Sequence, residues 1–85
     1  MKVVFSKHAK ERKFPALAKH GFNLTESDVL KVVENPEHED KDSDVPNIIA
    51  SKSFGEKLVL RVVYKKQNDI IKIITFYPAE KGRYY

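Results

Sequence analysis

The stretch KLVLRVVYKKQNDIIKIITFYP, residues 57–78, decides the fold of this chain. β-Branched and other apolar residues recur with a period of two on both sides of Asn68-Asp69, a pattern typical of two strands joined by a two-residue turn. The turn fixes which residues face each other across the hairpin. The predicted pairs are Gln67 with Ile70, Lys65 with Lys72, Val63 with Ile74, and Arg61 with Phe76.

The two faces of this predicted hairpin differ in chemistry. The face that should pack on helices has almost no charge and carries Leu58, Leu60, Val62, Tyr64, Ile71, Ile73, Thr75 and Tyr77. The other face mixes Val59, Val63, Ile70, Ile74 and Phe76 with the cations Arg61, Lys65 and Lys72. Lys65 facing Lys72 is unfavourable unless an anion lies between them, so the cations form a row suited to a phosphate backbone. The alternative is that lysines on an open sheet face only prevent aggregation.

Residues N-terminal to the hairpin predict one strand and two helices. Residues 2–5 are a short β-prone run, and Ser6 can cap a helix that opens at Lys7. Pro15 should kink or break that helix, and Gly21 is a suitable end. Residues 25–28, Thr-Glu-Ser-Asp, fit a capping box that starts a second helix, which ends at the Asn-Pro of residues 35–36.

The remaining segments complete one domain. Residues 35–45 are predicted to be an acidic, exposed loop, and the strand pattern then covers residues 47–53, 57–66 and 70–78. Eighty-five residues suffice for one core. We therefore expect residues 1–85 to form a single α+β domain of order β-α-α-β-β-β, with two N-terminal helices packed on an antiparallel sheet.

Charge and composition narrow the choice of partners. The net charge is +4, but residues 34–44 hold six acidic residues and one Lys, a local charge of −5, so the rest of the chain carries +9. A basic body attracts RNA or DNA, unless the charges only keep a small domain soluble. Cysteine is absent, which excludes disulfides, and no apolar run approaches the roughly 20 residues of a membrane span. We expect a cytoplasmic protein with no membrane partner.

Residues able to carry chemistry lie at both ends of the chain. His8 and Arg12 are four residues apart, hence on one side of the first predicted helix. A neutral imidazole can act as a general base, whereas Arg can only bind or stabilise charge. The alternative is that His8 is an ordinary surface or packing residue. At the other end, Arg83 can hold phosphate, and Tyr84 and Tyr85 can stack on unpaired bases. The alternative is that the tyrosines only cover apolar surface.

Metal and nucleotide motifs are missing from the sequence. The three histidines have no zinc-ligand spacing, and the acidic segment lacks the central Gly of a calcium loop, so no metal site is expected. There is no Gly-rich phosphate loop and no nucleophile elbow. The sequence therefore gives no sign of nucleoside-triphosphate or serine-hydrolase chemistry.

Several short motifs, taken in order along nearly the whole chain, resemble the BrnT-like branch of the RelE/ParE toxin superfamily and a related small family with an F-x-x-H-A-x-x-R opening. The matching stretches are residues 5–12 (FSKHAKER), 19–29 (KHGFNLTESDV), 34–36 (ENP), 60–64 (LRVVY), 71–75 (IKIIT) and 79–80 (AE), with a tail that ends in tyrosine. Each motif is short, so the resemblance rests on their order and spacing.

The resemblance implies a toxin of a toxin–antitoxin pair, an endoribonuclease that uses no cofactor and is silenced by a small antitoxin protein. The implied reaction is attack of a ribose 2′-hydroxyl on the adjacent phosphate, on RNA that can be ribosome-bound mRNA. Carried over by position, Arg61 would stabilise the phosphate and Tyr84 or Tyr85 would match the tail tyrosine. His8 as base, with Lys72 or Arg83 as further cations, is our own addition from the residue chemistry.

One position departs from the BrnT-like pattern. Where that pattern has an arginine after the final strand motif, this chain has Tyr77, so one expected phosphate-binding cation is missing. The alternative hypothesis is a non-catalytic RNA-binding or protein-interaction module on the same fold.

Overall fold

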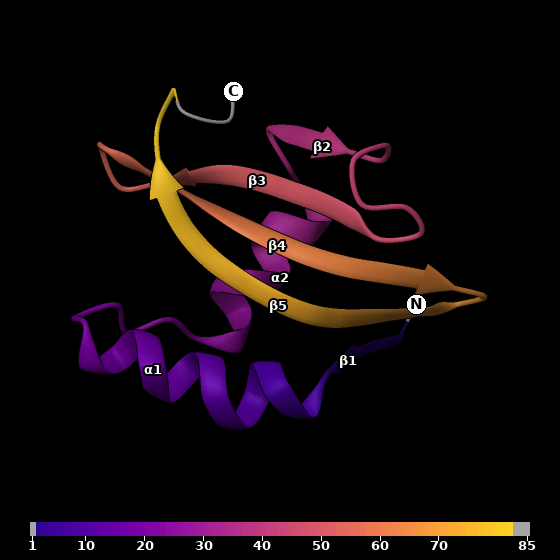
Figure 1. Cartoon of the computed structure of the whole chain (residues 1–85), viewed down its shortest axis with the longest axis horizontal. Helices are drawn as coiled ribbons and strands as arrows, with labels where there is room; N and C mark the ends of the chain where they lie inside the picture. Colours follow the sequence, from indigo (N-terminus) through magenta and orange to yellow (C-terminus); the bar gives the residue numbers. More distant parts are fainter. Residues whose placement is uncertain (1, 83–85) are drawn as a thin grey trace.

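Five strands form one mixed sheet in the computed structural model, which describes residues 2–82 (Figure 1). The strands are β1 (Lys2–Phe5), β2 (His38–Asp40), β3 (Ile48–Phe54), β4 (Leu58–Gln67) and β5 (Ile70–Glu80). Their order across the sheet is β1-β5-β4-β3-β2. The pairs from β2 to β5 are antiparallel as predicted, but β1 lies parallel to β5, so the prediction of a wholly antiparallel sheet is wrong for this edge. The parallel pairing follows from the helical crossover between β1 and the hairpin.

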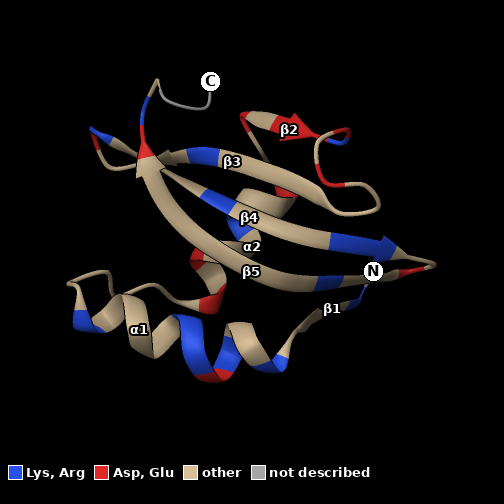
Figure 2. Ribbon diagram, viewed as in Figure 1, with Lys and Arg blue, Asp and Glu red and all other residues tan. Residues whose placement is uncertain are grey.

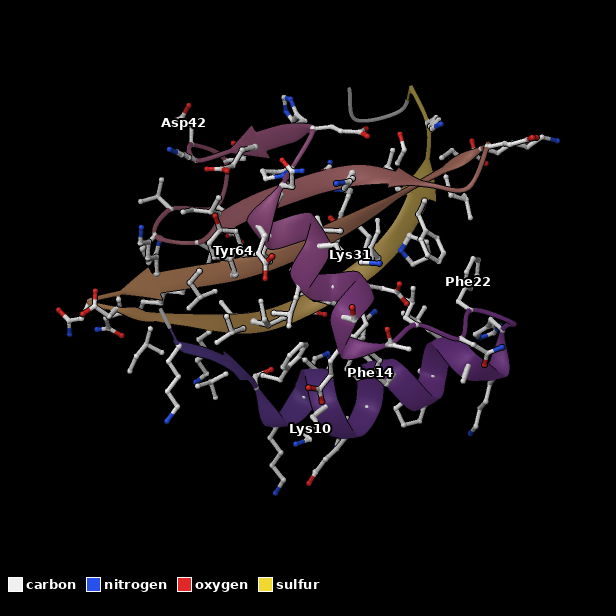
Figure 3. The ribbon with its side chains drawn as sticks, turned by 180° about the vertical axis from the view of Figure 1, so that it is seen from behind. Lys10, Phe14, Phe22, Lys31, Asp42 and Tyr64 are labelled. Atoms are coloured by element: carbon white, nitrogen blue, oxygen red, sulfur yellow. The ribbon has the colours of Figure 1, made fainter. Side chains whose placement is uncertain are left out.

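The helices lie on one face of the sheet and close the core. Helix α2 (Glu26–Glu34) crosses that face, with Tyr64 beside it, and α1 (Phe14–Lys19) lies along the β1 side (Figure 3). The core brings α2 against β3, β4 and β5 through Val29, Val32, Val33, Ala50, Leu60, Val62, Tyr64, Ile71, Ile73 and Phe76. The domain is thus α+β, with two layers around one core.

The first helical segment begins where the sequence predicts but does not break at Pro15. The backbone N–H of Ala9 donates to the Ser6 side chain at 3.1 Å, which confirms Ser6 as the cap. A π-helical segment, η1 (Ala9–Lys13), leads directly into α1, and Pro15 lies in the first turn of α1. The π-helical turn before Pro15 changes the hydrogen-bond spacing, since the backbone N–H of Phe14 donates to the carbonyl of Ala9, and the helix continues past the proline. It ends at Lys19, and Gly21 follows with the positive φ, 87°, expected of a helix stop.

The second helix starts as predicted. The backbone N–H of Asp28 donates to Thr25 Oγ1 at 3.2 Å, and the backbone N–H of Thr25 donates to Asp28 Oδ2 at 2.9 Å, which completes the capping box. Leu24, just before the cap, packs against the core cluster, and Val29 is fully buried. These contacts fix the angle at which α2 enters the core.

The acidic segment is not entirely a loop. Three of its residues form β2, which pairs with β3 through Glu39 and Ala50 among others, so the prediction of loop over residues 35–45 is wrong for residues 38–40. The turn after β2 is held by Asp40, which accepts hydrogen bonds from the backbone N–H groups of Asp42 and Ser43, each at 3.0 Å, and from the Ser43 hydroxyl. Sequence patterning misses so short an edge strand because three residues give no periodicity.

These hydrogen bonds to Asp40 give a prediction for acid titration. The Ser43 hydroxyl, then the backbone N–H groups, hold the pKa of Asp40 at about 2, below its ordinary value of 3.8. A lowered pKa stabilises the folded state at pH values above 3.8, and this contribution is lost as pH falls through about 2. Ser43→Ala should therefore raise the Asp40 pKa toward 3.8 in an NMR titration of the side-chain carboxyl. Ser53→Ala is the control, and an unchanged Asp40 pKa in Ser43→Ala would contradict the assignment.

A β-bulge corrects the predicted register of the hairpin. The turn and the first pairs are as predicted, including Gln67 with Ile70 and Lys65 with Lys72, and Asn68 has the positive φ, 58°, that such turns require. Between Tyr64 and Val63 the register shifts, so Tyr64 pairs with Ile73 but Val63 pairs with Thr75 and Ile74 is the extra residue. The Ser6 hydroxyl donates to the Ile74 carbonyl at 2.8 Å and so binds the bulged residue.

The extra residue reverses the two faces of β5 beyond the bulge. Phe76 points into the core and is fully buried, whereas Thr75 and Tyr77 pair with Val63 and Arg61 on the face away from the helices. The predicted pairs of Val63 with Ile74 and Arg61 with Phe76 are therefore wrong, as is the placement of Thr75 and Tyr77 on the core face. Arg61 instead pairs with Tyr77.

No helix among residues 2–82 has the length and apolar character needed to cross a membrane.

Candidate functional site

A groove at the turn end of the β4–β5 hairpin, on the sheet face away from α2, gathers residues from four parts of the chain. Its volume is about 580 Å³. The lining residues are Ser6 and His8 after β1, Pro46 and Asn47 before β3, Lys65 and Gln67 on β4, and Lys72 and Ile74 on β5. Three residues predicted from sequence as functional, His8, Lys65 and Lys72, thus line the same groove.

The two lysines give the groove its charge. Lys65 and Lys72 are directly opposite each other across the β4–β5 ladder, and both belong to the basic stretches that lie side by side in Figure 2. Like charges in this position repel and cost stability, and an anion held between them removes that cost. Acidic residues gather on β2 and the loop after it, and others lie on α2 and in the hairpin turn, where Asp69 follows Asn68 (Figure 2). The facing lysines themselves therefore favour a bound anion between their side chains.

His8 reaches this groove because Ser6 anchors the junction between β1 and the first helical segment. The backbone N–H of Ser6 donates to the carbonyl of Ile73 at 2.8 Å, and its hydroxyl donates to the next carbonyl along β5. The same hydroxyl accepts from the backbone N–H of Ala9 and so caps the helix. One serine therefore fixes the helix start, with the exposed His8, next to the bulge in β5.

Arg61 lies apart from the groove. It is four residues from Lys65 on β4, roughly 13 Å at the rise of an extended strand. Its side chain is only 6% exposed. Arg61 Nε donates to the Tyr77 hydroxyl at 3.1 Å, Nη1 donates to the buried Ser51 hydroxyl at 3.5 Å, and the guanidinium lies 5.8 Å from the Tyr77 ring centroid. The structure does not unite Arg61 with Lys65 and Lys72 in one site.

The bulge also explains what Tyr77 does. It puts Tyr77 opposite Arg61, where the phenol accepts a hydrogen bond and the ring offers its face to the guanidinium. A second arginine at this position would place two like charges opposite each other on the ladder. Tyr77 is thus a partner of the buried Arg61 side chain.

The other predicted residues are not brought into the groove. Arg12 is exposed on η1 and does not line it. Arg83, Tyr84 and Tyr85 lie outside the described residues. Within residues 2–82, no group of three or more His, Asp or Glu side chains is placed to hold a metal ion.

Sequence reasoning placed Ile74 on the face of the lysines but missed the other uncharged residues Gln67, Pro46 and Asn47. Gln67 could have been found, because it is two residues from Lys65 and so shares its strand face. Pro46 and Asn47 follow the acidic segment, and no sequence signal places them next to the hairpin. Pro46 and Asn47 line the groove only because β3, which follows them, pairs with β4 in the sheet.

Comparison of the chain with protein-family models, with curated proteins and with solved structures finds no match.

Proposed function

We propose that this protein binds single-stranded RNA in the groove and cleaves it as a metal-independent endoribonuclease, the toxin of a toxin–antitoxin pair. The observation that carries the proposal is that His8, Lys65 and Lys72 line one groove although they come from three segments of the chain. The reaction needs a group that accepts a proton and cations that offset the developing charge, and both line the groove. The toxin role and the antitoxin partner rest on the family resemblance alone.

The chemistry assigns a role to each of the three side chains. His8 accepts the proton of the ribose 2′-hydroxyl as the 2′ oxygen attacks phosphorus. The ammonium groups of Lys65 and Lys72 offset the charge that develops on the non-bridging oxygens. The bond from phosphorus to the 5′ oxygen breaks, and that oxygen takes a proton from water. The products are a 2′,3′-cyclic phosphate and a 5′-hydroxyl.

Loss of His8 should separate cleavage from binding. We expect His8→Gln to lower the cleavage rate of a 5′-labelled RNA by about 100-fold or more, the usual contribution of a general base, and to change RNA affinity little. His20→Gln is the matched control, because His20 is also exposed but lies at the end of α1. A substrate with a 2′-deoxy sugar at the cleaved position should resist the wild-type protein. Cleavage that survives His8→Gln unchanged would contradict the mechanism.

A second candidate function, RNA binding without cleavage, is favoured by the position of Arg61. The resemblance assigns phosphate stabilisation to this residue, yet its guanidinium is buried and bonded to Ser51 and Tyr77. Under this alternative the wild-type protein binds RNA, with an affinity that falls steeply with salt, and releases no cyclic phosphate. A protein that neither binds nor cleaves RNA would overturn both candidates.

A further inference from the structure

We propose that the groove holds one unstacked nucleotide of the RNA and selects an adenine or cytosine base over uracil through Asn47. This inference rests on the proposed function, because it places the nucleotide's phosphate at Lys65 and Lys72. It adds a base subsite in the uncharged half of the same groove.

The shape and walls of the groove suit a whole nucleotide. Its volume of about 580 Å³ lies within the roughly 300–1,000 Å³ of typical small-molecule sites. A site for phosphate alone needs only cations and N–H groups, whereas Pro46 and Ile74 add apolar surface beside the lysines. Proteins that recognise single-stranded RNA place splayed-out bases on such surfaces and bind their Watson–Crick edges with side-chain amides.

Hydrogen bonds to Asp44 fix which end of the Asn47 amide can meet a base. Asn47 Nδ2 donates to Asp44 Oδ2 at 3.3 Å, and the Asn47 backbone N–H donates to the Asp44 carbonyl at 2.7 Å. An ionised carboxylate only accepts hydrogen bonds, so the amide must turn its NH₂ group toward Asp44. The carbonyl oxygen of Asn47 is then turned away from Asp44 and is the acceptor that this side chain can offer to a ligand.

An acceptor at this point discriminates among bases. Adenine and cytosine carry an exocyclic amino group that donates a hydrogen bond, whereas uracil has a carbonyl oxygen at the corresponding position. The Asn47 oxygen accepts a hydrogen bond from the amino group of the first two bases and meets no donor at that position in the third. The Gln67 amide, also in the groove, can donate to the ring nitrogen next to the amino group.

Binding of short oligomers tests the base subsite. We would measure the affinity of the wild-type protein for 2′-O-methyl hexanucleotides of A, C and U, which cannot be cleaved by 2′-hydroxyl attack. We expect A and C oligomers to bind about tenfold more tightly than U oligomers, the discrimination expected of one good base contact. The affinities of the wild-type protein for AMP and CMP are measured separately. If these mononucleotides bind as tightly as the hexanucleotides, the ligand is a free nucleotide and the assignment to RNA is wrong.

Variants assign the preference to Asn47 and its orientation. Asn47→Ala should reduce the A-to-U ratio to about twofold or less and leave the affinity for U unchanged. Asp44→Ala, which frees the amide to rotate, should also lower the ratio, while it raises all affinities by removing a negative charge. Asn23→Ala is the matched control, because Asn23 is exposed and outside the groove.

The outcomes separate this inference from the proposed function. Equal binding of all three oligomers, or a preference for U, would overturn the base subsite and leave the RNA-binding proposal standing. An equal loss of affinity for every oligomer in Asn47→Ala would show a merely structural role for Asn47 and also overturn it. Failure to bind any oligomer would overturn the proposed function itself.

Discussion

Lys72→Glu should make the protein more stable and at the same time remove most of its RNA affinity. Because Lys72 faces Lys65 directly across the ladder, the substitution replaces a repulsive pair by an attractive one. Cross-strand pairs of this kind contribute about 0.2–1 kcal/mol, so the free energy of unfolding should rise by about that amount in urea titrations.

The loss of RNA affinity should be much larger than this gain in stability. A charge pair about 4 Å apart contributes about 1 kcal/mol even in bulk water, and reversal of the charge turns that attraction into an equal repulsion. The affinity for single-stranded RNA should therefore fall roughly 30-fold or more at low salt. The slope of log K against log salt should become shallower by about 0.7 for the lost phosphate contact.

Lys10→Glu is the control for net charge. It makes the same change in total charge, but Lys10 lies on η1 and its side chain projects away from the sheet (Figure 3). We expect it to reduce RNA affinity only by the weaker, long-range effect of a less basic surface. If Lys10→Glu weakened binding as much as Lys72→Glu, the groove would not be the phosphate site. If Lys72→Glu lowered stability, the two lysines would not repel each other as the ladder implies.

The gain in stability and the loss of RNA affinity in Lys72→Glu both follow from the pairing of Lys72 with Lys65. A like-charged pair that costs stability in the free protein becomes favourable when a phosphate lies between the two ammonium groups. An aggregation-preventing role for the same lysines predicts no such reversal, because either charge sign keeps an open sheet face soluble. Measurement of stability and affinity in one variant therefore distinguishes the two interpretations of Lys65 and Lys72.

Local rules predicted the elements of this fold well. The capping box at Thr25, the cap at Ser6 and the turn at Asn68 are each specified by two or three neighbouring residues, and each forms as expected. Pro15 shows the limit of such rules, because its effect depends on where in a helix it lies. The sequence does not reveal that a π-helical segment precedes it.

The site was harder to predict because it depends on tertiary structure. The bulge at Ile74 arises where the Ser6 hydroxyl binds a β5 carbonyl 68 residues further along the chain, a contact that hairpin counting cannot include. That one residue moved Tyr77 to the side of Arg61. The groove likewise depends on β3 lying beside β4, which brings Asn47 to the lysines. Lys65, Lys72 and Ile74 were predicted to share one face, whereas Pro46 and Asn47 were not predicted to lie beside them.

Phe76→Ala should be the most destabilising of the substitutions considered, because the bulge puts this ring in the centre of the core. Phe76 is fully buried, and its ring centroid lies 4.6 Å from that of Phe14, which in turn lies 5.9 Å from Phe5. The ring therefore joins β5 to α1 and β1. Removal of a buried Phe side chain costs about 3–5 kcal/mol, and a domain of this size has a stability of roughly 4–13 kcal/mol. The midpoint of urea unfolding should fall by at least about 1 M.

Thr75→Ala is the matched control for the register. In an unbulged hairpin Thr75 would face the helices and Phe76 would lie beside Arg61 on the other face. Replacement of Thr75 by Ala would then cost more stability, for each atom removed, than replacement of Phe76. With the bulge, Thr75 pairs with Val63 on the face away from the helices, and its replacement should change stability by less than about 1 kcal/mol. Comparable losses in the two variants would contradict the bulged register. A large loss for Phe76→Ala alone would support it, and with it the placement of Tyr77 beside Arg61.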